Sequence, residues 1–279
     1  MEEKVSETAV AIASLRALSN YELETTVQSR DELAELFLPE DRRGALCTPE
    51  SRAVIKQHIP KGMYEYVIAR TRYFDDVFIR AINDDIDQIV LLGAGYDSRP
   101  YRFDMRTDSI SIFELDTKPT QEHKIECLRK HNVDIRPNIS FIPTNFETDD
   151  PINLLGRYGY DKRRRTLFLW EGVTFYLSPA TVSHMLRRLN EDSGTGSRVV
   201  FDFQTMRSRN DLIETGLQDE TIKFGIESGK TDQFVENHHY RVVELVTAAE
   251  MEQRFLTLRN GELFGKIMPI MNFLLIEHE

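Results

Sequence analysis

The sequence has little cysteine and no long apolar run. Cys47 and Cys127 are too few for a disulfide framework and lack the spacing of a metal-binding knuckle, so we expect a reducing cytoplasmic location and no metal site. Apolar runs such as 89–92 are far shorter than the roughly 18 residues of a membrane helix. The first residues, 1–4, also lack the basic and then apolar pattern of a signal peptide. We therefore expect no membrane partner.

Positive charge is also scarce. The chain has 35 Lys and Arg against 46 Asp and Glu, which gives a formal net charge of −11. A field of that sign repels phosphate backbones, so nucleic acid is not expected as a partner. A length of 279 residues allows two domains. Because no stretch rich in Gly, Ser or Pro divides the chain, we predict a single domain over 1–279.

Strand and helix patterns alternate through the middle of the chain. Nearly continuous apolar runs, typical of strands buried on both faces, alternate with segments of helical spacing. The predicted strands are 88–92, 111–114, 140–143, 166–170 and 198–203, and the predicted helices between them are 120–130, 152–158 and 180–190. This alternation predicts an α/β fold with a doubly wound, mostly parallel sheet.

The flanking regions have other patterns. Residues 1–84 form a predicted helical N-terminal cap, in which 61–83 is a long amphipathic helix. Residues 85–204 form the predicted cofactor-binding core, and the polar segment 205–239 is interpreted as an insertion or lid. In 240–279, two late strands (240–245 and 271–277) surround a helix (248–255), which predicts an antiparallel edge on the sheet.

A glycine turn follows the first predicted strand. Gly93-Ala94-Gly95 lies where a nucleotide-like cofactor crosses the carboxyl ends of parallel strands, although a simple tight turn is the alternative. Asp116 ends the second strand, where a carboxylate can accept hydrogen bonds from ribose hydroxyls. The third glycine of dinucleotide-binding turns is replaced by Ser98. This favours S-adenosylmethionine, which has no pyrophosphate, over NAD.

The same stretch carries a family resemblance. Residues 91–103, LLGAGYDSRPYRF, resemble the "GAG-x-D-(S/T)-R-x-(Y/W)-R" signature of the leucine carboxyl methyltransferase family, which includes many bacterial small-molecule O-methyltransferases. The blocks at 66–72, 113–116 and 167–177 are similar to the family as well, so the resemblance covers roughly residues 5–200. It implies a Rossmann-like fold and S-adenosyl-L-methionine as the cofactor.

The resemblance also implies a set of cofactor-binding residues. They are Arg70, Gly93, Ala94, Gly95, Asp116, Asn145, Phe146 and Glu171. Arg70 would bind the cofactor's carboxylate, Asp116 the ribose, and Glu171 would balance the ammonium or sulfonium charge. Asn145-Phe146 stands where the family usually has Asp-Leu, so the adenine contact at Asn145 has no charge.

The acceptor side is less defined by the sequence. A carboxylate acceptor needs no general base, whereas a hydroxyl acceptor usually does. Candidate catalytic residues are Tyr176, His238 and His239, and the alternatives are packing for the tyrosine and exposed loop positions for the histidines. An acidic acceptor would need a cation from the segment after Met206; the candidates are Arg207, Arg209, Lys223, Lys230 and Arg241. The basic run 162–165 precedes a strand and is interpreted as a surface turn.

The sequence therefore predicts an S-adenosylmethionine-dependent O-methyltransferase. We expect a monomer or homodimer that methylates a carboxylate or hydroxyl of a small molecule. Three alternatives stay open at this point. They are a methyltransferase for protein C-terminal carboxylates, an NAD-dependent oxidoreductase and a cofactor-binding protein without catalysis.

Overall fold

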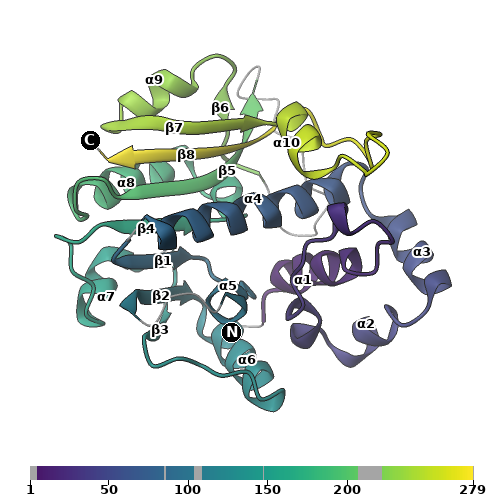
Figure 1. Ribbon diagram of the computed structural model, residues 1–279. Helices are drawn as coiled ribbons and strands as arrows, with labels where there is room; N and C mark the ends of the chain where they lie inside the picture. The colour runs from purple at the N-terminus through teal and green to yellow at the C-terminus, as the bar shows by residue number, and fades with distance from the viewer. Residues whose placement is uncertain (1–4, 85, 104–108, 147, 207–221, 279) are drawn as a thin grey trace.

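A mixed α/β architecture is built on one central sheet (Figure 1). The computed structural model describes residues 5–84, 86–103, 109–146, 148–206 and 222–278. Its strands are β1 (Gln88–Leu92), β2 (Ser111–Asp116), β3 (Ile139–Pro143), β4 (Thr166–Trp170), β5 (Arg198–Met206), β6 (Ile226–Glu227), β7 (Tyr240–Thr247) and β8 (Met271–His278).

The strands are ordered β3-β2-β1-β4-β5-β8-β7, and β6 pairs with the end of β5. Strands β1 to β5 are paired in parallel, whereas β8 is antiparallel to both of its neighbours, β5 and β7. The predicted fold class, with its antiparallel edge, is confirmed. The antiparallel strand itself lies one position inside that edge.

Helices cover both faces of the sheet. They are α1 (Glu7–Ser19), α2 (Glu40–Gly44), α3 (Pro49–His58), α4 (Met63–Asn83), α5 (Arg99–Arg102), α6 (Lys118–Lys130), α7 (Pro151–Arg157), α8 (Pro179–Glu191), α9 (Thr231–Glu236) and α10 (Ala248–Phe255), with 3-10 turns η1 (Thr25–Val27), η2 (Ala34–Phe37) and η4 (Thr174–Tyr176). Among the described helices, none is long and apolar enough to cross a membrane.

Strand β1 shows why its sequence is continuously apolar. Ile89 belongs to a buried cluster that contains Phe74 of α4, whereas Val90 belongs to a second cluster that contains Leu186 of α8. Successive side chains of a strand point to opposite faces, so a strand covered by helices on both sides needs an apolar residue at every position. The first cluster also includes Val10 of α1, which ties the N-terminal helix to the sheet.

The N-terminal region and the insertion differ from the expectation. Within the predicted helical cap, residues 34–37 form the 3-10 turn η2 and not an α-helix. Helices α2 and α3 had no separate prediction, because neither contains a buried residue that would create an apolar period. Of the proposed lid, residues 207–221 lie outside the described residues. Its described part contains the end of β5, which runs on to Met206, and then β6 and α9, of which α9 packs against β7. The single-domain organisation stays a prediction.

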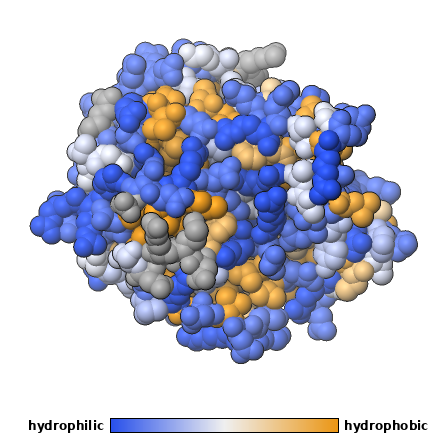
Figure 2. Space-filling view, in the orientation of Figure 1, coloured by the Kyte–Doolittle hydropathy of each residue, from blue (hydrophilic) through white to orange (hydrophobic). Residues whose placement is uncertain are grey.

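The surface agrees with the acidic, polar composition. Figure 2 shows that hydrophilic residues cover most of the face seen in Figure 1, and that hydrophobic residues appear between them in separate areas. The basic run 162–165 is an exposed turn before β4, as predicted, and Arg163 pairs there with Asp161.

Candidate active site

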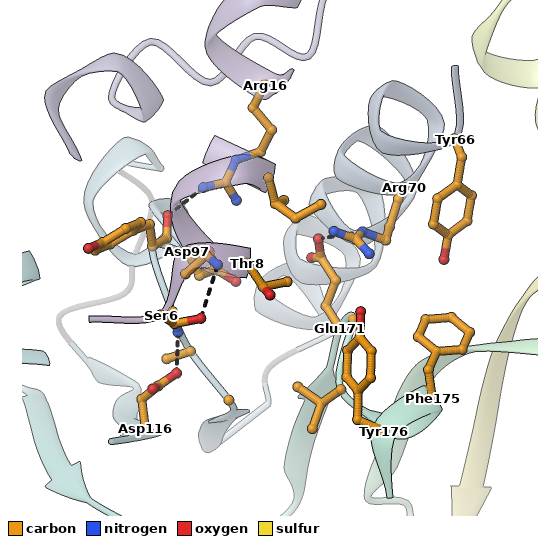
Figure 3. Close-up of a pocket in the computed structure, with 18 of the residues that line it drawn as sticks. Ser6, Thr8, Arg16, Tyr66, Arg70, Asp97, Asp116, Glu171, Phe175 and Tyr176 are labelled. Carbon is orange, nitrogen blue, oxygen red and sulfur yellow. Dashed lines mark hydrogen bonds and ion pairs between the residues drawn. The ribbon is translucent and has the colours of Figure 1, made fainter. Parts of the chain in front are cut away.

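A cavity of about 260 Å³ lies at the carboxyl ends of β1, β2, β4 and β5 (Figure 3). In parallel α/β sheets this edge is where ligands bind. Helix α1 forms one wall through Ala9 and Ile12, and α4 forms another through Tyr66 and Arg70. The cavity is therefore bounded by elements that are far apart in the sequence.

The glycine turn after β1 forms the floor of the cavity. Gly93 and Gly95 have φ values of +74° and +45°, which side chains other than that of glycine rarely adopt. A Cβ at Gly93 would lie 2.5 Å from Cγ2 of Val173, and one at Gly95 would lie 3.5 Å from the Cβ of Ala9. The turn thus packs closely against the loop after β4 and against α1.

Asp116 holds this turn in place from the end of β2. Its Oδ2 accepts a hydrogen bond from the N–H of Gly95 at 2.6 Å, and its Oδ1 accepts one from the N–H of Thr117 at 2.7 Å. Burial raises the pKa of Asp116, and these two backbone bonds partly offset that rise. The carboxylate lines the cavity, where it can accept further hydrogen bonds.

A buried ion-pair cluster lies at the other end of the cavity. The Nε of Arg70 lies 3.0 Å from Oε1 of Glu171, and its Nη1 lies 3.3 Å from Oδ2 of Asp202. The hydroxyl of Tyr66 and the N–H of Gly172 donate to Asp202 at 2.6 and 2.7 Å. Burial alone would lower the pKa of Arg70, but the carboxylates of Glu171 and Asp202 raise it, and the net shift is upward.

The cluster extends beyond the Arg70–Glu171 pair. Oε2 of Glu171 lies 2.8 Å from Nη1 of Arg99, which is 1% exposed and also pairs with Asp75 and Asp97. The members of the whole network are Arg16, Arg70, Arg99, Arg102, Asp31, Asp75, Asp97, Glu171 and Asp202. Because removal of one partner leaves an uncompensated buried charge, such networks fix side-chain positions.

Most of the predicted site residues meet at this one cavity. Those that line it are Arg70, Gly93, Ala94, Gly95, Asp116, Phe146, Glu171 and Tyr176. Asn145 is not among the lining residues, and its backbone N–H donates to Asp149. The structure thus brings together one expected cation, two expected carboxylates and the glycine turn, while their individual roles stay predictions.

The two candidate histidines lie elsewhere. A ring nitrogen of His238 lies 2.6 Å from the carbonyl oxygen of Phe234, and its imidazole packs on the Phe234 ring. His239 has a φ of +61° and accepts a hydrogen bond from Asn190 through its backbone oxygen. Neither histidine lines the cavity, so the structure gives them no position from which to act as a general base.

The expected cationic anchors are also elsewhere. Lys230 pairs with Glu227, and Arg241 pairs with Glu277. Arg207 and Arg209 lie outside the described residues. Lys223 lines a second cavity of about 620 Å³, which shares Phe146 and Tyr176 with the first. The second cavity adjoins the first, but neither Arg70 nor Glu171 lines it.

Several lining residues were missed by sequence reasoning. Ser6, Thr8 and Arg16 come from the N-terminal segment and α1, and Gln204 comes from β5. A signal for β5 was present, because Asp202 and Gln204 alternate with apolar residues and thus share one face of the strand. For α1 the signal lay in the family resemblance, because Thr8-Ala9 and Arg16-Ala17-Leu18 are similar to the family's N-terminal "TA…RA" pattern.

Comparison with known proteins finds a matching family model and similar proteins. The family model described as "Leucine carboxyl methyltransferase" matches residues 9–190. A protein of Frankia alni, provisionally named an S-adenosyl-L-methionine-dependent methyltransferase, is 32% identical over 69% of this chain and 66% of its own length. A protein of Mycobacteroides abscessus with the same provisional name is 27% identical over 90% of this chain and 87% of its own length.

A solved structure extends the agreement to the fold. The crystal structure of a DUF574 family protein from Streptomyces avermitilis covers 96% of this chain and 97% of its own, with 12% identity and a TM-score of 0.63. The matches confirm the resemblance seen in the sequence, and they confirm S-adenosylmethionine as the expected cofactor. Among the described residues, no group of three or more His, Cys, Asp or Glu could hold a metal ion.

Proposed function

The chain belongs to the leucine carboxyl methyltransferase family, and from this premise we propose that it transfers the methyl group of S-adenosylmethionine to an oxygen atom of a small-molecule acceptor. The proposal rests on the set of residues that line one cavity. The glycine turn, Asp116 and the Arg70–Glu171 ion pair all line it, at the carboxyl ends of neighbouring strands.

The lining residues fit the cofactor group by group. Asp116 lies at the end of β2, where its carboxylate can accept bonds from ribose hydroxyls, and Phe146 offers a ring to the adenine. Arg70 and Glu171 offer opposite charges at the far end, as a zwitterionic methionine group requires. Bound there, S-adenosylmethionine supplies a methyl group on a sulfonium, which is already activated for displacement by an oxygen nucleophile.

The protein's part in such a reaction is alignment and exclusion of water. Helix α1 lies over the glycine turn, and the N–H of Ser6 donates to Thr120 Oγ1 at 3.3 Å just before the helix starts. These contacts hold the N-terminal wall against the sheet side of the cavity. Tyr176 lines both cavities, which places it where an acceptor could enter, and we propose that its ring contacts the acceptor.

Specific residues of the structure bear on two alternative functions, methylation of a protein tail and oxidation or reduction with NAD. The family name suggests methylation of a protein C-terminal carboxylate, and the second cavity, which adjoins the first at Phe146 and Tyr176, is the path that a protein tail would need. An oxidoreductase using NAD is less consistent with the turn. Ser98 is buried and its hydroxyl donates to Asp31 at 2.6 Å, so this position does not provide the close helix packing of a third glycine.

The first experiment is calorimetric titration with S-adenosylmethionine and with NAD. We expect binding of S-adenosylmethionine only, and binding of NAD alone would contradict the proposal.

The second experiment incubates the protein with S-adenosylmethionine and a panel of small acids and phenols, and identifies methylated products by mass spectrometry. A peptide with a free carboxyl terminus and its amidated form test the protein-tail alternative, because only the free form can be methylated at that end.

A further inference from the structure

The residues that line the cavity are arranged in order across the sheet. Asp116 is the last residue of β2, the glycine turn follows β1, Glu171 follows β4, and Gln204 belongs to β5, so the lining residues cross the sheet in the order of its strands. If the ribose lies at Asp116 and the methionine at Arg70 and Glu171, an acceptor approaches from the β5 side. Gln204 is the polar side chain that β5 contributes to the cavity there.

Gln204 is placed by the same strand that holds the ion-pair cluster. Asp202 and Gln204 lie two residues apart in β5, so both point to the α4 side, about 7 Å apart along the strand. Asp202 binds Tyr66 and Arg70 of α4. Gln204 therefore lies one step beyond that cluster, beside Met271, its partner in β8.

The Gln204 side chain is buried with an unused acceptor. It is 2% exposed, and among the described residues none donates a hydrogen bond to its Oε1. A buried amide oxygen without a donor costs free energy, so such a group in a ligand cavity indicates that the ligand supplies the donor. The surrounding wall is apolar, formed by Met63, Phe175 and Met271.

The cations of the cavity are already neutralised. Of the described residues that line it, the basic ones are Arg16 and Arg70. Arg16 lies 3.2 Å from Asp31 and donates to the carbonyl oxygen of Tyr96, while Arg70 is paired with two carboxylates. In the proposed complex Arg70 also holds the cofactor's carboxylate, and Lys223 lines the adjoining cavity and not this one. Among the described residues of this cavity, an anionic acceptor beside Gln204 would therefore have no partner for its charge, and burial of such a charge is costly.

Resting on the proposed function, we propose that Gln204 is an acceptor-binding residue and that the acceptor is a neutral molecule with an apolar body and a reacting hydroxyl. The hydroxyl donates to Oε1 of Gln204, which an ionised carboxylate cannot do because it has no proton. As the hydroxyl oxygen takes the methyl group, the sulfonium would become the neutral thioether of S-adenosylhomocysteine, and the hydroxyl proton would pass to solvent water, because the Gln204 amide is not a base. The apolar body packs on Met63, Phe175 and Met271. Of the two acceptor groups considered, a carboxylate and a hydroxyl, the inference therefore favours the hydroxyl.

The test compares Gln204→Met with a matched control, Gln253→Met, which makes the same change at an exposed position of α10. The probes are two pairs of neutral and anionic molecules, para-cresol with para-toluate and benzyl alcohol with benzoate. Each is titrated by saturation-transfer NMR against protein saturated with S-adenosylhomocysteine at neutral pH. We expect the alcohols to bind and the acids not to bind, and Gln204→Met to weaken alcohol binding roughly tenfold.

A second readout separates binding from structural support. Because Gln204→Met removes a buried polar group that lacks a donor, the free variant should have a Tm equal to or above that of the wild type, with unchanged affinity for S-adenosylmethionine. A lower Tm, preference for the acids, no binding of any probe, or alcohol binding equal to that of Gln253→Met would each overturn the inference. If wild-type protein does not bind S-adenosylmethionine, the proposed function fails instead.

Discussion

Replacement of Asp116 by alanine tests the cofactor site most directly. The carboxylate accepts bonds from the backbone N–H groups of Gly95 and Thr117 at 2.6 and 2.7 Å, and it also faces the cavity. A hydrogen bond to a charged group contributes about 1.5–3 kcal/mol, so loss of the ribose contact alone should weaken S-adenosylmethionine binding roughly 10- to 150-fold. Loosening of the glycine turn should add to this loss.

Calorimetric titration of the wild type and three variants provides the measurement. Asp116→Asn keeps the size but removes the charge and presents an N–H₂ group to backbone donors, so it should bind almost as weakly as Asp116→Ala. The control is Asp134→Ala, which removes the same charge at an exposed position and should bind like the wild type. If folded Asp116→Ala retains an affinity within about twofold of the control, which is far below the loss expected for one charged hydrogen bond, the assignment of Asp116 to the ribose is refuted.

Variants at three further positions test other parts of the structure. Gly93→Ala should lower the Tm, because φ is +74° and the new Cβ would meet Val173 Cγ2; adding Val173→Ala should restore only the steric part of the loss. Arg70→Lys should weaken S-adenosylmethionine binding about tenfold or more, since a lysine cannot bind a carboxylate bidentately; calorimetry that finds wild-type affinity would contradict this role. Burial lowers the pKa of His238 in the folded protein, so near the ordinary histidine pKa of about 6.5 the unfolded chain binds more protons than the folded one. The free energy of unfolding should therefore fall as the pH decreases through about 6.5. Urea titrations should show a weaker pH dependence for His238→Gln.

The fold could be predicted wherever burial leaves a local pattern. The run 88–92 gave the bounds of β1 without error, and the same holds for β4 at 166–170, because strands covered on both faces are apolar at every position. Helix α3 could not be found in this way. It buries none of its residues, so its sequence carries no apolar period.

The part of the site that could be predicted consists of residues that belong to a sequence motif or end a predicted strand. The glycine turn and Asp116 adjoin predicted strands, so the topology of a parallel sheet was enough to bring them together. The partners of Arg70 could not be found from spacing, since Asp202 belongs to a strand more than a hundred residues later and its pairing depends on how α4 crosses the sheet. The alternation of Asp202 and Gln204 with apolar residues shows that both share one face of β5, but it does not show that α4 and the cavity lie on that face, so Gln204 was missed as well.

The charge of the site is set by the buried network and not by the chain's net charge of −11. The network holds four arginines and five carboxylates, so with every group ionised it has one excess negative charge. Asp116, which lines the cavity outside this network, adds a second negative charge. S-adenosylmethionine carries a sulfonium, an ammonium and a carboxylate, a net charge of +1, so it offsets one of these two charges. Because charges in a low-dielectric interior interact far more strongly than at the surface, this negative excess favours a cationic cofactor, and it favours a neutral acceptor over an anionic one.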